Sequence, residues 1–327
     1  MATITLIEAV REAMLEEMRR DSSVFVMGED VGKRGGVFLA TKGFIEEFGS
    51  ARVLDTPLAE ASIAGIAVGS AMHGLRPIAE IQFADFIWPT INQLVGEAAR
   101  VRYGTKGKLN VPMVVRSPYG GHVRGGLYHS QSVESFFAHT PGLKVVIPAT
   151  PYDAKGLLKS AIRDDDPVIV LEHKRTYRSV RGEVPDEDYV IPIGSADVKL
   201  EGEHATIVTY GLTLHYSLQA AEILAKDGIK IEIIDLRTVR PIDIETIITS
   251  VQKTNRVLIV QEDNAAVSVG SEVSALISEH SFESLDAPIM RCTGPEIPAM
   301  PFAPTLESVY MPTSEKIETK LRELLSY

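Results

Sequence analysis

The stretch of sequence that decides the fold is DTPLAEASIAGIAVGSAMHGLRPIAEIQF, residues 55–83. Asp55 or Thr56 can cap a helix, and Pro57 suits its first turn because proline has no backbone N–H to leave unpaired there. The small and apolar residues 59–72 continue this helix, and residues 77–83 then form a predicted strand. A helix followed directly by a buried strand is the repeating unit of a parallel sheet covered by helices.

The same alternation extends in both directions from this stretch. Thr5 and Glu8 have the spacing of a capping box, and apolar residues then recur at helical spacing, which predicts a first helix ending near Arg20. The predicted strands of this region are 24–27, 77–83, 113–116, 144–147 and 168–171, and the later predicted helices are 86–102 and 152–163. Strands that alternate with helices predict a parallel sheet with helices on both faces.

A polar segment without periodicity, 181–203, separates this region from a second one. It contains Pro185 and Pro192, and we expect the domain link there. Beyond it the predicted strands are 206–210, 231–235 and 256–260, and the predicted helices are 214–226, 242–253 and 269–279. The predicted fold class is therefore α/β, with a first domain over residues 1–185, a linker over 186–203 and a smaller α/β domain over 204–327.

Composition argues against several classes of protein. The formal net charge is −11, whereas nucleic-acid binding requires a concentrated basic surface. The longest apolar run, 63–72, is too short for a membrane span, and the N-terminal residues lack the pattern of a signal peptide. Cys292 is the single cysteine, so no internal disulfide is possible. We therefore expect a cytoplasmic protein that binds neither nucleic acid nor membrane, although its acidity would suit a basic protein partner.

Glu60 is the first candidate for a chemical role. It lies at the mouth of a helix whose following residues are almost all apolar or small, so its carboxyl group would be largely desolvated and its pKa raised. The alternative is an ordinary first-turn glutamate that is stabilised by the helix dipole. The residues alone leave both interpretations open.

Two further candidates lie at loops after predicted strands. His129 follows a glycine-rich loop, from which a histidine can reach a ligand and exchange protons near neutral pH, or simply face solvent. Gln82 and Phe86 lie at a strand end, where the aromatic side chain belongs either to the core or to the wall of a site for a flat heteroaromatic ligand. Zinc-binding, nucleophile-elbow and phosphate-loop motifs are absent from the sequence.

Taken together, these residues resemble the β subunit of the E1 component of 2-oxo acid dehydrogenases. The resemblance covers essentially the whole chain in order. The matching segments are GEDVG (28–32), GGVF (35–38), DTPLAE (55–60), EIQFADF (80–86), RSP (116–118), HSQ (129–131), PGLKVV (141–146), TPYDAKG (150–156) and DLRT (235–238).

The resemblance implies a transketolase-like architecture and a cofactor. The first domain would bind the pyrimidine of thiamine diphosphate, and the second would be a transketolase C-terminal-like assembly domain. In this family the diphosphate and its Mg²⁺ are held by a separate α subunit through a Gly-Asp-Gly…Asn motif, which is absent here. The resemblance therefore implies a heterotetramer of two α and two β subunits. It also implies docking to the subunit-binding and lipoyl domains of the E2 dihydrolipoyl acyltransferase.

The resemblance also implies roles for individual residues. Glu60 corresponds to the glutamate that gives a hydrogen bond to N1′ of the aminopyrimidine, a role that requires a carboxyl group kept protonated by burial. His129 corresponds to the histidine that moves protons near the intermediate and the incoming lipoyl group. Leu58, Gln82 and Phe86 match cofactor-contacting positions, and Phe86 replaces the tyrosine of some relatives, so a hydroxyl contact would be missing there.

Some members of this family also hold a structural K⁺, mostly through backbone carbonyls. Such sites leave little trace in the identity of side chains. The matching positions are Val111, Met113, Val114, Ala161, Asp164 and Asp166.

The substrate implied is a 2-oxo acid that is oxidatively decarboxylated, with reductive acylation of a lipoyl group. Residues 127–132 and 172–175 resemble the branched-chain type more than the pyruvate type, and pyruvate and acetoin dehydrogenases are the alternatives. Two hypotheses of other classes are a non-catalytic subunit that only docks the acyltransferase and a nucleotide-dependent oxidoreductase. The second lacks the glycine fingerprint expected after a strand.

Overall fold

The computed structural model describes residues 2–327, which divide into two compact units. Unit 1 contains the chain up to Tyr119 together with Phe136–Ile193, and unit 2 contains Gly120–Ser135 and Gly194–Tyr327. The boundary at residues 193 and 194 lies inside the segment where the sequence indicated a link. Gly120–Ser135, in contrast, packs with unit 2 although it lies well within the first predicted domain.

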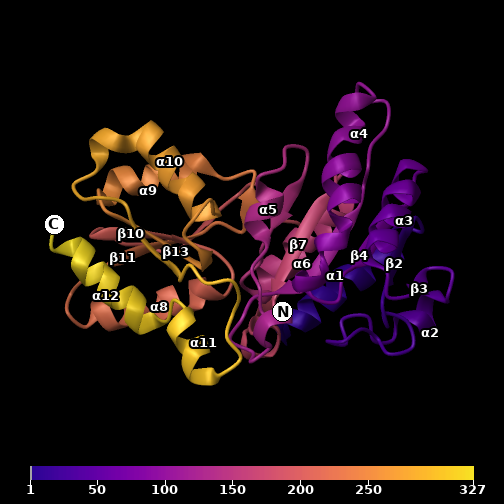
Figure 1. Cartoon of the computed structure of the whole chain (residues 1–327), viewed down its shortest axis with the longest axis horizontal. Coiled ribbons are helices and arrows are strands. Elements are labelled where there is room, and N and C mark those ends of the chain that lie inside the picture. The colour runs from indigo at the N-terminus through magenta and orange to yellow at the C-terminus, as the bar shows by residue number, and fades with distance from the viewer. Residues whose placement is uncertain (1) are drawn as a thin grey trace. The chain divides into compact units, whose positions relative to one another are not determined.

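Unit 1 is built on parallel strands in the order β6-β7-β5-β4-β2-β3. Figure 1 labels β7, β4, β2 and β3 in this order across the unit. Val24 and Val26 of β2 belong to the core cluster that includes α1 and α6, so Phe25 and Met27 point to the opposite face. All four are buried, which explains why this strand is a continuous apolar run. The strands are β2 (Val24–Gly28), β3 (Val53–Asp55), β4 (Arg76–Glu80), β5 (Val114–Tyr119), β6 (Lys144–Val146) and β7 (Val168–His173).

The first helix of unit 1 begins as its sequence indicates. The hydroxyl of Thr5 accepts from the backbone N–H of Glu8, and the Glu8 carboxylate accepts from the Thr5 N–H, so the predicted capping box is confirmed. Helix α1 then packs against α6. The helices of the region are α1 (Leu6–Arg20), α2 (Phe44–Phe48), α3 (Glu60–Met72), α4 (Ala99–Gly104), α5 (Glu134–Ala138), α6 (Pro151–Arg163) and α7 (Thr176–Ser179). An antiparallel pair, β1 (Ala2–Thr5) and β8 (Arg181–Val184), completes it.

The prediction of a continuous helix over residues 86–102 was wrong. The chain instead forms the short helices η1 (Ala84–Phe86) and η2 (Trp88–Thr90), the π-helix η3 (Asn92–Ala98), and then α4. Pro89 lies in the first turn of η2, where its missing N–H and fixed ring prevent a regular helix from running through. The bends bring η2 and η3 against α3.

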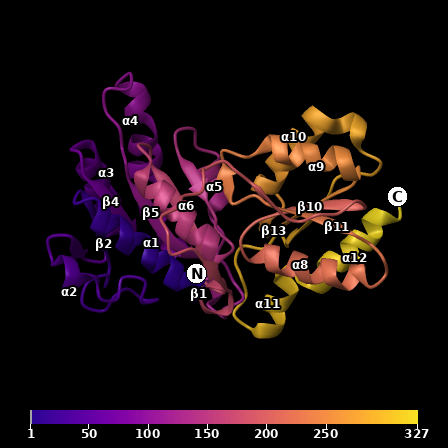
Figure 2. The same ribbon diagram turned by 180° about the vertical axis from the view of Figure 1, so that it is seen from behind.

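Unit 2 has a second sheet, in the order β14-β13-β10-β11-β9, with β9 antiparallel to its neighbour. Figure 2 shows α9 and α10 on one side of this sheet and α8 and α12 on the other. The strands of this sheet are β9 (Asp197–Leu200), β10 (Ala205–Thr209), β11 (Ile231–Asp235), β13 (Val257–Asn264) and β14 (Met290–Gly294), and the short strand β12 (Thr238–Arg240) is not part of it. The helices are η4 (Gly126–Tyr128), α8 (Leu212–Ala225), α9 (Ile244–Thr254), α10 (Val269–Ser281), η5 (Phe282–Ser284), α11 (Pro304–Tyr310) and α12 (Ser314–Leu325).

Within residues 2–327, no helix combines the length and the apolar character that crossing a bilayer requires. Cys292 is buried on β14, and burial raises the pKa of its thiol to about 11. A thiol in that state is a small apolar side chain rather than a nucleophile.

Candidate active site

Three neighbouring strands of unit 1 end at the same level of the sheet. Gly28 at the end of β2 pairs with Asp55 on one side and with Glu80 on the other. The loops that follow these strands therefore leave from one edge, the carboxyl edge, where parallel sheets bind their ligands. Glu29 and Glu60 both lie in or just after these loops.

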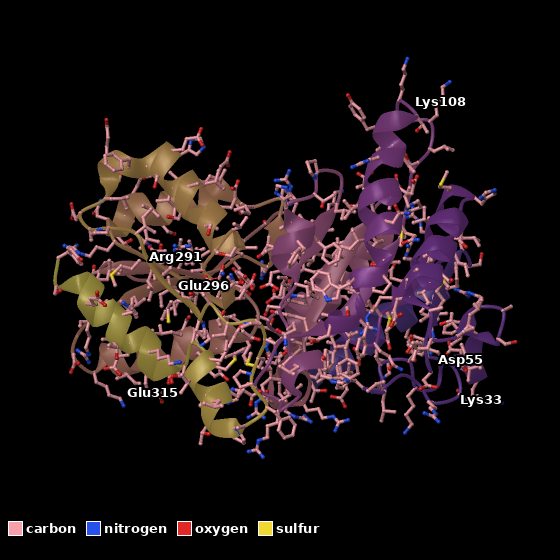
Figure 3. The ribbon with its side chains drawn as sticks, in the orientation of Figure 1. Lys33, Asp55, Lys108, Arg291, Glu296 and Glu315 are labelled. Carbon is pink, nitrogen blue, oxygen red and sulfur yellow. The ribbon has the colours of Figure 1, made fainter. Side chains whose placement is uncertain are left out.

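Glu60 is the first residue of α3, and its side chain is half-buried in the single chain. The expectation that Asp55 or Thr56 caps this helix was wrong, because the helix begins later and its N-cap, Ala59, offers no side chain for a cap. Asp55 instead accepts from the backbone N–H groups of Gly32 (2.5 Å) and Lys33 (3.4 Å), and so joins two loops of the edge (Figure 3). The first turn of α3 therefore has no side-chain cap, and the N–H groups of Ser62 and Ile63 donate to the carbonyl of Ala59.

Glu29 is a carboxylate that the sequence analysis did not single out. It is buried, and burial raises its pKa, with further increases from the charges of Glu60, Asp30 and Glu80. The carboxyl groups of Glu29 and Glu60 are therefore close enough to influence each other. The buried hydroxyl of Thr56, on the adjoining loop, has no hydrogen-bond partner in the chain. A carboxylate placed directly after a buried strand was the signal available in the sequence.

A buried ionic cluster lies on neighbouring strands. The Arg116 guanidinium is 1% exposed and donates to Glu172 from Nε (2.7 Å) and Nη2 (2.5 Å), and to Glu80 from Nη1 (2.5 Å). The hydroxyl of Tyr177 donates to Glu172 as well (2.6 Å). Burial opposes the charge on Arg116, but Glu172 and Glu80 outweigh it and raise the pKa of the guanidinium. The cluster ties β4, β5 and β7 together.

Aromatic rings line the loop after β4. Phe83 meets Phe86 edge to face, with 5.9 Å between ring centroids, and meets Phe38 at 5.7 Å. Gln82 and Phe86 are half-buried, and Leu58 is 79% exposed. Among the predicted cofactor contacts, Glu60, Leu58, Gln82 and Phe86 thus all belong to the carboxyl-edge loops of unit 1.

His129 belongs to unit 2, in the segment Gly120–Ser135. It follows the short helix η4 as its C-cap, and its side chain is half-buried. Its neighbours Leu127 and Tyr128 are 56% and 68% exposed. The structure therefore assigns the two predicted catalytic residues, Glu60 and His129, to different units.

The positions predicted for K⁺ carry other contacts. Lys144 Nζ pairs with both carboxylate oxygens of Asp164 (2.8 and 2.7 Å), and Arg102 pairs with Asp166 (2.7 Å). The carbonyl of Asp164 accepts from Arg76 at 2.8 Å. Of these contacts, only the one from Arg76 engages a backbone carbonyl, whereas Lys144 and Arg102 contact side-chain carboxylates.

The carbonyls of the remaining positions are partly engaged as well. That of Val111 accepts from the N–H of Met113, and that of Met113 accepts from Val168. Val114 starts β5, and Ala161 is buried within α6. Throughout residues 2–327, no group of three or more His, Cys, Asp or Glu side chains is arranged to hold a metal.

Comparison with known proteins agrees with this arrangement. Residues 2–180 match the family model of the transketolase pyrimidine binding domain, and residues 194–317 match that of the transketolase C-terminal domain. Over 327 residues, which is the full length of both chains, the protein is 59% identical to the 2-oxoisovalerate dehydrogenase subunit beta of Bacillus subtilis. This chain belongs to the family of 2-oxo acid dehydrogenase E1 β subunits.

A second member of this family sets the scale of the similarity. The pyruvate dehydrogenase E1 component subunit beta of Bacillus subtilis is 48% identical, again over the full length of both chains. A solved structure of a split-gene transketolase, described as an inactive β4 tetramer, matches 99% of each chain with a TM-score of 0.79 and 23% identity. That likeness confirms the predicted fold, two transketolase-like α/β domains. The family depends on thiamine diphosphate.

Proposed function

We propose that this E1 β chain supplies the pyrimidine half of a thiamine diphosphate site and, with an α subunit, decarboxylates branched-chain 2-oxo acids and acylates the lipoyl group of an E2 acyltransferase. The observation that carries the proposal is the position of Glu60. It lies in the uncapped first turn of α3, close enough to buried Glu29 that its charge raises the pKa of Glu29. The residues around it fit the cofactor. Thr56 offers an unpartnered hydroxyl, and Phe83 and Phe86 form an aromatic wall.

The cofactor, when bound, supplies the carbon nucleophile and the electron sink of the reaction. Glu60 holds a proton on its carboxyl oxygen and donates it in a hydrogen bond to N1′ of the pyrimidine. Glu29, whose own pKa is raised by burial and by the charge of Glu60, is a second acidic group on this edge. Phe86, Gln82 and Leu58 would contact the cofactor when it is bound. His129 moves a proton at the reacting end of the substrate and at the lipoyl sulfur.

The α subunit is part of the proposal because this chain lacks half of the site. The Gly-Asp-Gly…Asn motif that would hold Mg²⁺ and the diphosphate does not occur in the sequence. Leu58 is 79% exposed and Ile66, on α3, is 53% exposed, although both are large apolar side chains. Burying them against a partner would be favourable. We therefore propose a heterotetramer of two α and two β subunits, with Mg²⁺ held by the α subunit.

Docking to E2 is supported by charge. The formal net charge of −11 suits the basic subunit-binding domain of an acyltransferase, and the lipoyl domain of the same protein would deliver the acceptor. The single Cys292, which is free and buried, is consistent with a cytoplasmic protein. A structural K⁺ held by backbone carbonyls at the predicted positions stays part of the proposal, although the carbonyl of Asp164 already accepts from Arg76.

Branched-chain substrates are preferred because identity is higher to the 2-oxoisovalerate enzyme (59%) than to the pyruvate enzyme (48%). Pyruvate remains the second candidate, since one or two methylenes change discrimination by only about 1–3 kcal/mol. The test is coexpression with the α subunit, followed by CO₂ release from 3-methyl-2-oxobutanoate and from pyruvate, with thiamine diphosphate and Mg²⁺. We expect turnover only with the α subunit and a higher kcat/KM for the branched substrate. Activity of the isolated chain would contradict the need for an α subunit. A preference for pyruvate would contradict the proposed branched-chain substrate.

A further inference from the structure

The segment that carries His129 is attached to unit 2 at its beginning by two buried carboxylates. Glu307, on α11, is 2% exposed, and its Oε1 accepts from the backbone N–H groups of Val123 (3.1 Å) and Arg124 (3.0 Å). Glu262, on β13, is 3% exposed and accepts from the N–H of Gly121 at 2.5 Å. Both carboxylates lie far along the chain from the segment that they hold.

The other end of the segment is attached as well. The hydroxyl of Tyr210 donates to Glu134 (2.9 Å), and that of Ser135 donates to Asp263 (2.7 Å). His129 lies between the two attachments, next to the exposed Leu127 and Tyr128. Its position in space is therefore set by contacts at both ends of Gly120–Ser135 with the rest of unit 2.

The backbone of residues 122–124, at the first attachment, has a strained conformation that hydrogen bonds to Glu307 stabilise. His122 and Arg124 both have a φ of 59°, a conformation that is costly for residues with a β-carbon. The turn that results directs the successive N–H groups of Val123 and Arg124 at one point. Such a pair of N–H groups forms a concave site for an anion, and the Glu307 carboxylate fills it. Without this oxygen, the N–H groups of Val123 and Arg124 would lose this partner and the strain would lose its compensation.

We propose that Glu307 is a positioning residue for His129: its carboxylate holds the strained turn at 122–124 and thereby fixes where the histidine stands for proton transfer. The inference rests on the proposed role of His129. A misplacement of about 1 Å at a reacting group reduces turnover about 100-fold, so loss of this contact should be visible in kcat although Glu307 never touches the substrate.

The experiment uses the complete enzyme with its α subunit and compares Glu307→Ala, Glu307→Gln, His129→Ala and the double variant His129→Ala with Glu307→Ala. Lipoyl-dependent turnover is measured beside decarboxylation with an artificial electron acceptor, and amide hydrogen exchange is measured over residues 121–131. Glu296→Ala is the matched control, because Glu296 also accepts from two successive N–H groups, those of Ala265 and Ala266, but in a different loop (Figure 3).

We expect Glu307→Ala to lower the lipoyl-dependent kcat about 100-fold, with a smaller effect on the acceptor assay, an unchanged KM and faster exchange over 121–131. Glu307→Gln, whose amide oxygen can still accept both bonds, should restore most of kcat. The double variant should be no slower than His129→Ala, because both changes impair the same proton transfer. Glu296→Ala should change neither kcat nor exchange in this segment.

Other outcomes separate the possible failures. If Glu307→Ala behaves like Glu296→Ala while His129→Ala is inactive, the positioning role is overturned and the role of His129 stands. If His129→Ala keeps full lipoyl-dependent activity, the role of His129 in the proposed function is wrong. Should Glu307→Ala not fold, Glu307→Asp, whose carboxylate is drawn back from the turn, is compared with Glu307→Gln. The proposal requires the aspartate variant to be the slower of the two.

Discussion

Burial raises the pKa of Glu29, and the charge of Glu60, at the start of α3, raises it further. The two residues are brought together because β2 and β3 end at the same level of the sheet, as the pairing of Gly28 with Asp55 fixes. The charge of Glu60 therefore favours the protonated form of Glu29. The relationship gives a stability prediction and a catalytic prediction.

The stability prediction concerns Glu29→Gln. Because the pKa of Glu29 is raised in the folded chain, the folded state holds this proton more tightly than the unfolded state does. Stability is therefore fully present below the ordinary glutamate pKa and is lost as the pH rises toward the folded value. The neutral amide should increase the free energy of unfolding relative to wild type at about pH 8 and change it less at about pH 5. Urea denaturation measures both, and Glu46→Gln, an exposed site, should show no difference between the two conditions.

The catalytic prediction concerns Glu60→Gln in the assembled enzyme. An amide keeps the size of the side chain but cannot hold and return a proton, so kcat should fall about 100-fold or more. Initial-rate measurements of CO₂ release give the result. Glu272→Gln is the matched control, since Glu272 also lies in the first turn of a helix, α10, and should leave kcat unchanged. Decarboxylation at the wild-type rate in Glu60→Gln would remove the proposed role.

The alternation of strands and helices was predictable from sequence because buried strands such as β2 are uniformly apolar and helices such as α1 carry a strong cap. The start of α3 was not, because Asp55 looked like a cap but bonds to the loop at Gly32. The helix predicted from residue 86 failed at Pro89, whose local effect overrode the apolar periodicity.

The candidate site was predictable only in part. Glu60, Gln82 and His129 could be named because they follow predicted strands or glycine-rich loops. The membership of Gly120–Ser135 in unit 2 could not be predicted, since it depends on Glu262 and Glu307, which contact it from far along the chain. Periodicity reports local structure and carries no information on such long-range contacts.

The buried cluster around Arg116 gives a test of what holds the carboxyl edge together. Arg116→Ala leaves Glu80 and Glu172 buried without their cation, so we expect a loss of about 3–5 kcal/mol in the free energy of unfolding. The surface pair of Arg19 and Glu47 is the control, because both side chains are exposed and Arg19→Ala should cost less than about 1 kcal/mol. Urea titration of the two variants compares them. Similar losses would mean that the buried cluster is not an important source of stability.

Glu134, one of the groups that attach the His129 segment, should make unit 2 sensitive to pH near neutrality. Burial raises its pKa to about 8, with a further increase from Asp263, and its Oε2 has no hydrogen-bond partner. The folded chain therefore prefers the protonated acid, and stability should fall as the pH rises from the ordinary glutamate pKa toward about 8 and then level off. Glu134→Gln keeps a group that can accept from Tyr210 and removes the titration, so its unfolding free energy should vary less between about pH 6 and pH 8. Urea unfolding across that range decides the point, and a wild-type slope retained in the glutamine variant would assign the dependence to another group.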